Sequence, residues 1–400
     1  MSIAGSRVAV VGGSIAGCAA AIALGRAGCD VTVYERTHGV LRDRGFGIGM
    51  PMALHDELVS ARYLDASTPA CRYDQRIVLV REQGNELGRV LGTQRMPMAC
   101  QNWAILWGTL RAKVPGASYL TGMPVASVQA EDREPTLTLA DGGRRRFDVI
   151  IGADGYGSIV RPIVAPSATM VAAGYALWRG ICREDQLPAA AVRELEAGPC
   201  MVMYPDGHGL AYLVPGPGGP ASRLLNWAVY IVPPTELDGF RFLPAGAVDD
   251  TLLDLLDNVL TEHFPPLWAQ AFRLTGRDRV CVQPIGDVDA PTLVYGRLAV
   301  SGDAGALSRP HTGSGAATAL HDALALERWC RTAGDWDEAL DGYNSERCPA
   351  RNAQTELGRM LGRALITDRR EWARMSSADF ERWWTAVASG QKFLYRTDLP

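Results

Sequence analysis

Residues 7–35 constrain the fold of this chain more than any other segment. They comprise, in order, a short strand, a glycine-rich turn, a helix and a second strand, at residues 7–11, 12–17, 18–27 and 30–34. The first strand is apolar and rich in β-branched residues, which is typical of a parallel strand buried on both faces. A single acid, Glu35, follows the second strand. This order predicts a βαβ unit that binds a dinucleotide.

The residue types in the turn suit a pyrophosphate. Gly12 permits a tight turn, Ser14 is small enough for the backbone to approach phosphate oxygens, and Gly17 lets the helix pack close to the strand. Ile15 and Ala16 lie between them, where the start of the helix offers free N–H groups to the phosphates. Ser14 stands where this motif usually has its second glycine, so its Cβ narrows the approach.

The acid at the end of the second strand indicates which dinucleotide is bound. Glu35 lies 23 residues after Gly12 and can accept hydrogen bonds from ribose hydroxyls. Arg36 beside it is included in the predicted site. A carboxylate suits the free 2′-hydroxyl of FAD or NAD and repels a 2′-phosphate, so NADPH is not the dinucleotide of this turn.

Two later segments also run from a buried strand into a polar turn. The first, residues 147–161, carries Asp154 and Gly155 in its turn and ends at Arg161. The second begins as a strand at Arg297 and leads, in order, to the pair Gly302-Asp303, the loop 309–315 and a helix from Ala316.

With these three motifs the chain resembles the single-component FAD-dependent aromatic hydroxylases, the para-hydroxybenzoate hydroxylase family, over about residues 6–360. The glycine turn, Trp178-Arg179-Gly180 and Arg309-Pro310-His311 are most similar to its 2,6-dihydroxypyridine hydroxylase and salicylate hydroxylase-like members. The resemblance implies an α/β fold, with a Rossmann-like FAD-binding domain of the glutathione-reductase type, an inserted, mainly antiparallel β-sheet substrate domain, and C-terminal helices.

The domain boundaries follow from the same resemblance. A discontinuous FAD-binding domain is expected at residues 1–75, 97–167 and 287–370. The substrate-binding sheet is expected at residues 76–96 and 168–286, where alternating, aromatic-rich runs are separated by turns. A C-terminal helical extension is expected at residues 371–400.

The resemblance also implies which residues hold FAD. The ADP half would contact Gly12, Ser14, Ile15, Ala16, Gly17, Glu35 and Arg36, and the phosphates would contact Arg44. Asp154 and Gly155 match a motif implicated in both FAD and NAD(P)H binding, with Arg161 after it, and Gly302 and Asp303 match the segment that binds the ribityl chain. The loop beside the flavin ring would be Pro310, Gly313, Ser314, Gly315 and Ala316. The chain departs from the family where many members have arginine in place of Trp103, which leaves one phosphate or nicotinamide contact unassigned.

The implied reaction is hydroxylation of an electron-rich aromatic or heteroaromatic molecule with O₂ and NAD(P)H, through a C4a-hydroperoxyflavin, as in bacterial aromatic catabolism or secondary metabolism. NADPH and NADH both stay open as the donor. The catalytic candidates are His311, Pro310, Tyr204, Tyr212 and Arg179. Each has a structural alternative: a backbone-bonded loop histidine, tyrosines of a sheet core, or an arginine paired with a carboxylate across the sheet instead of an anionic substrate.

Composition limits the other functions. The nine cysteines form no C-x-x-C motif and indicate a reduced, cytoplasmic protein, and the net charge of −4 gives no basic excess for nucleic acid. No histidine and cysteine spacing suggests a metal site. A flavin-dependent halogenase needs a catalytic lysine, and the only lysines, Lys113 and Lys392, are not placed for that role. An FAD-dependent reductase or dehydrogenase, and a redox sensor without turnover, stay open.

The C-terminal region predicts one more helix. Ser376 and Asp379 have capping-box spacing, an apolar stripe follows, and Gly390 suits the helix end. The stripe comprises Phe380, Trp383, Trp384 and Val387. It predicts a contact with the core or with a second subunit, as in a homodimer. Stable membrane docking is disfavoured because the polar face lacks lysine.

Overall fold

The predicted βαβ unit forms the centre of a six-stranded sheet in the computed structural model. The structure describes residues 2–39, 46–131, 133–219, 222–234, 237 and 241–390. The sheet has the order β16-β17-β10-β1-β2-β6 and is parallel except for β16. Its strands are β1 (Arg7–Val11), β2 (Asp30–Glu35), β6 (Tyr119–Thr121), β10 (Val149–Gly152), β16 (Val294–Tyr295) and β17 (Leu298–Val300). The three predicted motifs therefore leave from the carboxyl ends of adjacent strands.

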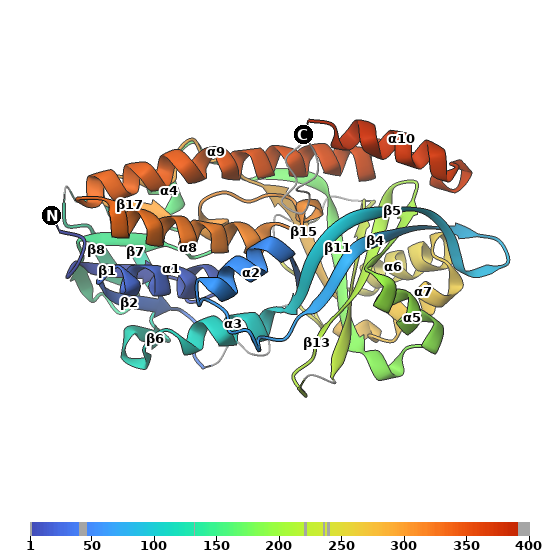
Figure 1. The fold of residues 1–400 in the computed structure, drawn as a ribbon, viewed down its shortest axis with the longest axis horizontal. Coiled ribbons are helices and arrows are strands. Elements are labelled where there is room, and N and C mark those ends of the chain that lie inside the picture. The colour runs from blue at the N-terminus through green and yellow to red at the C-terminus, as the bar shows by residue number, and fades with distance from the viewer. Residues whose placement is uncertain are drawn as a thin grey trace.

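Helices and a small sheet complete the core around these strands. The helices are α1 (Ile15–Arg26), α3 (Trp103–Ala112), α4 (Arg161–Val164), α8 (Gly315–Thr332) and α9 (Trp336–Gly362). The small sheet is β7 (Val125–Gln129), β8 (Thr136–Leu139) and β9 (Arg144–Arg146). The long helices α8 and α9 lie side by side along this part of the molecule (Figure 1). One hydrophobic core joins α1, α8 and the parallel strands.

An eight-stranded, mainly antiparallel sheet forms the other half, in the order β15-β11-β14-β13-β12-β4-β5-β3. Its strands are β3 (Gly47–Pro51), β4 (Cys71–Glu82), β5 (Asn85–Asn102), β11 (Val171–Arg183), β12 (Cys200–Tyr204), β13 (Gly207–Pro215), β14 (Arg223–Ile231) and β15 (Cys281–Asp287). Only the β4–β12 pair is parallel. The α/β fold with an inserted antiparallel sheet is thereby confirmed.

The two faces of this second sheet are covered by different helices. One face, called here the outer face, packs against α5 (Ala189–Ala197), α6 (Asp250–His263) and α7 (Pro266–Arg273). The inner face packs against the end of α9, the π-helical turn Arg363–Thr367 that continues it, and α10 (Ser377–Ala388). Figure 1 shows α10 beside β5, well away from the parallel sheet. The C-terminal helix therefore belongs to the inner face.

The C-terminal helix and the cysteines agree with the sequence predictions. Ser376 Oγ accepts from Asp379 N at 3.2 Å and the capping box is complete, so the predicted start of α10 is confirmed. The apolar stripe of α10 packs into the core on the inner face, so of the two predicted contacts the structure shows the one with the core. All nine cysteines are free thiols. The domain boundaries stay a prediction, with one difference: β3 and the outer parts of β4 and β5 belong to the second sheet, because β3 pairs with β5.

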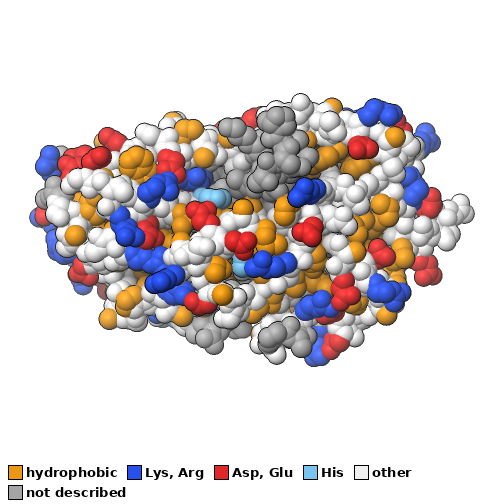
Figure 2. Space-filling model, viewed as in Figure 1, with side chains coloured by type: hydrophobic (Ala, Val, Ile, Leu, Met, Phe, Trp, Pro, Cys, Tyr) orange, Lys and Arg blue, Asp and Glu red, His pale blue; other side chains and the backbone are white. Residues whose placement is uncertain are grey.

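The remaining elements connect the two halves. α2 (Met52–Ser60) lies between β3 and β4 in the chain, and its Leu54 and Leu58 side chains pack into the core of the parallel-sheet half. On the face shown in Figure 2, acidic and basic side chains are interspersed, in keeping with the small net charge. Within the described ranges, no helix combines the length and the apolarity that crossing a bilayer requires.

Candidate active site

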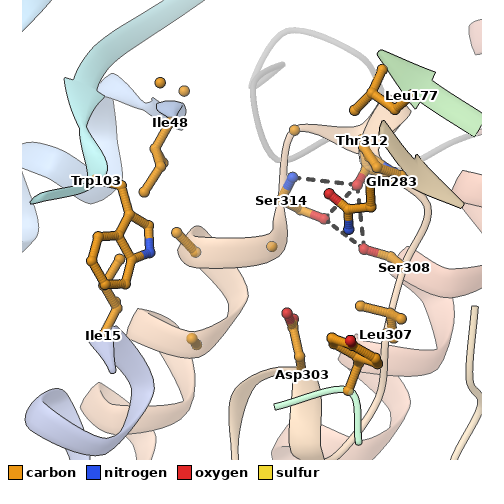
Figure 3. Close-up of a pocket in the computed structure, with 18 of the residues that line it drawn as sticks. Ile15, Ile48, Trp103, Leu177, Gln283, Asp303, Leu307, Ser308, Thr312 and Ser314 are labelled. Carbon is orange, nitrogen blue, oxygen red and sulfur yellow. Dashed lines mark hydrogen bonds between the residues drawn. The ribbon is translucent and has the colours of Figure 1, made fainter. Parts of the chain in front are cut away.

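One cavity of about 750 Å³ lies between the two sheets. One end, called here the turn end, is lined by the glycine turn after β1. The opposite end, called the loop end, is lined by residues 307–308 and 310–316, before and at the start of α8. Its sheet half runs along the inner face of the eight-stranded sheet. In Figure 3, Ile48 and Trp103 lie opposite Thr312 and Ser314 across this space. All three predicted motifs thus open into a single cavity.

Backbone contacts fix the turn end. Gly12 has φ of 99°, and a Cβ there would lie 2.4 Å from the carbonyl oxygen of Ala153, so only glycine fits. Gly13 N donates to Glu35 Oε2 and Thr37 N to Glu35 Oε1, both at 2.8 Å. Glu35 therefore orients the turn, and its remaining lone pairs can accept from ribose hydroxyls.

The helix that follows the turn explains the spacing of its small residues. A Cβ on Gly17 would lie 1.9 Å from the carbonyl oxygen of Gly12, so Gly17 packs α1 against the strand end and does not line the cavity. Ser14, Ile15 and Ala16 do line it. The first N–H groups of α1 lack intrahelical partners and favour a negative charge there.

The loop end is organised by hydroxyl groups. Ser308 Oγ lies 3.1 Å and Thr312 Oγ1 2.5 Å from Ser314 Oγ (Figure 3). Gly313 has φ of 61°, a left-handed conformation that turns the chain into α8. The N-terminus of α8 consequently faces the cavity beside Pro310, which also lines it.

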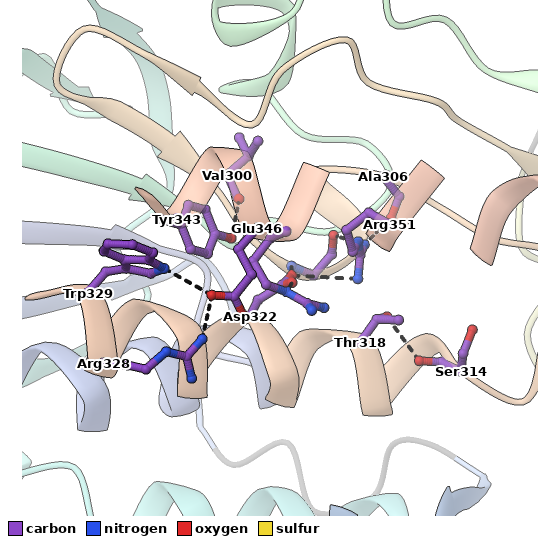
Figure 4. A network of polar contacts seen from close by, with 12 residues as sticks. Val300, Ala306, Ser314, Thr318, Asp322, Arg328, Trp329, Tyr343, Glu346 and Arg351 are labelled. Atoms are coloured by element: carbon purple, nitrogen blue, oxygen red, sulfur yellow. Dashed lines mark hydrogen bonds and ion pairs between the residues drawn. The ribbon is translucent and has the colours of Figure 1, made fainter. Parts of the chain in front are cut away.

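A buried charge network holds the loop after β17 (Figure 4). Gly302 N donates to Asp322 Oδ2 at 3.0 Å, and Arg347 Nε donates to Asp322 Oδ1 at 2.9 Å. Arg351 lies 3.6 Å from Asp322 Oδ2 and donates to the carbonyl oxygens of Gly302 and Ala306. Asp322 therefore neutralises two buried arginines and fixes Gly302 at the same time.

Asp303 projects from this loop into the cavity (Figure 3). Burial raises the pKa of Asp303, while Arg351 and Arg161 oppose the increase. Arg161 does not line the cavity: it donates to the carbonyl oxygens of Tyr156 at 2.6 Å and Asp303 at 3.3 Å. Its guanidinium links two cavity loops from behind, so the structure gives Arg161 a supporting position and no direct contact with the cavity.

Several buried polar atoms that belong to cavity-lining residues have no hydrogen-bond partner among the residues that the structure describes. They are Asp154 Oδ1, Arg179 Nε, His208 Nδ1, Asn226 Nδ2 and His311 Nδ1. Buried polar atoms in proteins are almost always satisfied, so this set indicates a ligand with polar groups along its length. A Cβ added at Gly155 or Gly315 would meet nothing within 4 Å, so both backbones face open space. The residues present therefore fit FAD, with its phosphates at the turn end and its ring at the loop end.

His311 lies where the loop end meets the sheet half. Its Nε2 is 2.7 Å from the Tyr175 hydroxyl. Its ring centroid lies 4.4 Å from that of Tyr230 and 5.3 Å from that of His208. The backbone-bonded alternative predicted for His311 does not hold for Nε2, since its partner is a tyrosine side chain.

The charge state of His311 gives a testable pH dependence. Burial, Arg309 and Arg76 lower its pKa from 6.5 to about 3. Between these two values the unfolded chain binds a proton that the folded chain does not, so the free energy of unfolding decreases as the pH falls through this range. We expect His311→Asn to flatten this acid-side decrease, measured by denaturant unfolding between pH 7 and pH 4.5. An unchanged slope would contradict the lowered pKa.

Arg179 brings a positive charge into the sheet half. Its guanidinium carbon lies 4.1 Å from the centroid of the Phe46 ring, and burial lowers its pKa. No ion pair between described residues involves Arg179, so the carboxylate across the sheet that the sequence left open is not found. Tyr212 and Asn226 also line this part, and Asn226 Oδ1 accepts from Gly47 N at 2.7 Å.

Three further residues predicted from the sequence lie away from the cavity lining or outside the described residues. Tyr204 does not line the cavity: its ring stacks on His263 at 5.3 Å on the outer face, so its side chain does not reach the cavity where a catalytic group would act. Gly302 does not line the cavity. A Cβ at this position would lie 2.7 Å from Cβ of Ala16, so glycine lets the loop after β17 pack against the start of α1. Arg44 lies outside the described residues.

The structure adds residues that the sequence did not single out. They are Arg76, Gln94, Met201, Tyr230, Gln283, Leu361, Leu365 and Trp384 along the sheet half, with Asp322, Arg347 and Arg351 behind the loop. The residues along the sheet half come from different strands of the eight-stranded sheet, from the end of α9, from the turn that continues α9 and from α10, so strand register and helix docking bring them together. Asp322 carried a usable signal, as a lone acid on the apolar face of a predicted helix.

Three comparisons place the chain among known proteins. Residues 7–61 match the pyridine nucleotide-disulphide oxidoreductase family model, a range that includes the βαβ unit, β3 and α2. The chain is 29% identical over 346 residues to 2,6-dihydroxypyridine 3-monooxygenase of Paenarthrobacter nicotinovorans, covering 82% of this chain and 83% of that protein. Its fold matches the structure of 2,6-dihydroxypyridine-3-hydroxylase from Arthrobacter nicotinovorans with a TM-score of 0.80 at 23% identity, over 91% and 94% of the two chains. Klebsiella pneumoniae HpxO complexed with FAD and uric acid matches with a TM-score of 0.75 at 20% identity, over 96% and 92%.

Fold and cavity together define a flavoprotein with a Rossmann-like FAD domain and an inserted sheet. The chain is a homologue of the single-component FAD-dependent aromatic hydroxylases, which are flavin-dependent monooxygenases.

Proposed function

We propose that the protein hydroxylates a small, electron-rich aromatic or heteroaromatic ring bearing an oxyanion or carboxylate, with O₂ and NAD(P)H as co-substrates. The observation that carries this proposal is the cavity itself: His311 and Arg179, each with an unpartnered buried nitrogen, line the sheet half beside the site that fits FAD. The matched 2,6-dihydroxypyridine 3-monooxygenase supports the substrate class.

The residues that would hold FAD are the cavity-lining ones named above. The turn Gly12–Ala16 and Glu35 would bind the ADP half, with Asp154 and Gly155 beside it. Asp303 would bind the ribityl chain, and the loop 310–316 the ring. When bound, FAD supplies the redox chemistry that activates O₂. The positive end of α8 would stabilise negative charge on the ring, as its N–H groups face that end of the cavity.

The chain's own residues would bind and orient the substrate. Arg179 would pair with the anionic group, which relieves the cost of a buried guanidinium without a carboxylate. His311 is neutral at pH 7 in the ligand-free protein and would hydrogen-bond the ring hydroxyl; a nearby anion would raise its pKa and make it a better proton acceptor. Leu177, Met201 and Leu210 exclude water from the ring.

The proposal also covers the nucleotide that reduces the flavin, the cellular compartment and the division into domains. Either NADPH or NADH would reduce the flavin from outside the Glu35 site, since that acid repels a 2′-phosphate. The nine free thiols support a reducing compartment such as the cytoplasm. The proposed FAD domain is the half that contains the parallel sheet, and the proposed substrate domain is the eight-stranded sheet with its outer helices.

The proposal is tested with the FAD-loaded protein under ¹⁸O₂. Oxidation of NADPH and of NADH is followed with a panel of hydroxylated pyridines and benzoates, together with analogues that lack the anionic group. We expect rings with that group to stimulate oxidation most and the label to enter the product. If no ring stimulates oxidation and no label is incorporated, hydroxylation is excluded. Anaerobic reduction of an added acceptor would then favour the reductase alternative.

Asp303 gives a prediction for cofactor binding alone. Asp303→Ala removes the carboxylate proposed to bind the ribityl hydroxyls, and hydrogen bonds to charged groups are worth about 1.5–3 kcal/mol, so FAD affinity should fall roughly ten- to a hundredfold. The flavin content of the purified protein and its titration with FAD measure this. Asp254→Ala is the matched control, because Asp254 lies on α6 with its side chain 65% exposed. Equal FAD affinity of both variants would refute the role of Asp303.

A further inference from the structure

The C-terminal helix contributes one side chain to the cavity. Trp384 of α10 lines the sheet half together with Leu361 and Leu365, from α9 and the turn that continues it. These residues cover the inner face of the sheet, opposite α5, α6 and α7 on the outer face. The described C-terminal segment therefore forms a wall of the cavity that the nucleotide-binding motifs do not provide.

Specific contacts fix the position of this wall. A Cβ added at Gly92 of β5 would lie 2.7 Å from Cδ1 of Phe380, so glycine is what lets α10 approach the strand. Arg89 of the same strand donates to the carbonyl oxygens of Ala373 at 2.9 Å and Met375 at 3.0 Å, just before α10 begins. The helix is therefore anchored at its start and along its packed face.

Two adjacent tryptophans of α10 have different surroundings. Trp383 packs edge-on against Trp372 at a centroid distance of 4.7 Å and against Phe380 at 5.6 Å, and it is not part of the cavity lining. Trp384, one residue on, is half-buried and lines the cavity. Since successive helical side chains point about 100° apart, one tryptophan anchors the helix while the next faces the cavity.

We propose that Trp384 determines which aromatic rings the enzyme accepts, by offering an indole surface to the ring and by limiting its size. The inference rests on the proposed function, since it concerns the substrate of that same cavity. Aromatic rings attract one another in offset or edge-on arrangements, so an indole in the wall favours a flat substrate over an aliphatic one. Its bulk excludes a second fused ring from the space it occupies, because closely packed walls yield little. Trp384 is thus a specificity-determining residue.

The experiment compares Trp384→Ala with Trp383→Ala, a matched change at the neighbouring position. The probes are a dihydroxypyridine and a dihydroxyquinoline with the same substituents on a fused ring system. Binding to the oxidised FAD-loaded protein, without reductant, is followed through the change in flavin absorbance, and kcat/KM is measured separately. Thermal unfolding and flavin content establish that each variant is folded and loaded. Gly92→Val, which displaces Phe380 without touching the cavity, tests the wall independently.

We expect Trp384→Ala to raise the ratio of quinoline to pyridine binding by about tenfold, within the range that single pocket contacts contribute to discrimination. Gly92→Val should shift the ratio in the same direction, because it pushes Phe380 and the whole of α10 away from β5. Trp383→Ala keeps the Phe380 contact with β5 and the Arg89 hydrogen bonds that position α10, so it should leave the ratio within about twofold. If Trp384→Ala shifts the ratio no more than Trp383→Ala does, the inference is wrong. That outcome differs from failure of the proposed function, in which neither probe perturbs the flavin or is hydroxylated by the unmodified protein.

Discussion

Replacing His311 by asparagine is expected to lower kcat for ring hydroxylation by about 100- to 10,000-fold, the usual contribution of a positioned acid or base. His311 sits between the loop end and the sheet half, with Nε2 at 2.7 Å from the Tyr175 hydroxyl. Because Tyr175 occupies Nε2, only the unpartnered Nδ1 remains for another hydrogen bond. Asparagine keeps a polar side chain but cannot accept and return a proton at neutral pH. Steady-state kinetics, in which hydroxylated product labelled from ¹⁸O₂ is quantified, measure the loss of kcat.

The control for this variant is His263→Asn. His263 also stacks on a tyrosine, Tyr204, but on the outer face of the sheet, so its removal should leave kcat nearly unchanged. The FAD content of both variants should match that of the unmodified protein, since neither side chain is placed against the phosphates. A His311→Asn enzyme with normal kcat and normal product labelling would remove His311 from the reaction.

The cofactor half of the site could be predicted from the sequence because its signals are local. The strand, turn, helix and acid of residues 7–35 lie within one βαβ unit, and the physics of that unit is fixed by neighbours in the chain. The same holds for Asp154 and Asp303, since each directly follows a buried parallel strand, and such strands end at one edge of the sheet. The position of the Arg161 guanidinium could not be predicted, because a side chain after a turn can point behind the cavity as easily as into it.

The residues that line the sheet half of the cavity depend on the register of the strands, and this register cannot be read from the sequence. Side chains alternate between the faces of a strand, so one residue decides whether a tyrosine meets the cavity or the outer helices. Tyr212 falls on the inner face and Tyr204 on the outer face, although both lie near the same hairpin. Trp384 is harder still, because its place depends on where a distant helix docks on β5. An amphipathic stripe predicts that one face of α10 is buried, but it does not predict which element covers that face.

Asp322→Ala is expected to destabilise the protein by about 3–5 kcal/mol, the cost of leaving buried charges without their partner. The change removes the carboxylate that Arg347 Nε approaches at 2.9 Å and that Arg351 approaches at 3.6 Å, and both arginines are at most 11% exposed. It also orphans Gly302 N, so the loop carrying the cofactor-facing acid loosens and FAD affinity falls with stability. Denaturant unfolding of the FAD-free and FAD-loaded forms separates the two effects.

Glu346→Gln is the matched control, because Glu346 pairs with Arg328 and accepts from Trp329 in the same region, but at the surface (Figure 4). An exposed ion pair contributes about 0–1 kcal/mol, so this variant should unfold near the midpoint of the unmodified protein. The contrast tests burial directly: both substitutions remove an acid that bridges α8 and α9, and only the buried acid holds the loop after β17. Equal midpoints for the two variants would show that the Asp322 network does not stabilise the FAD site.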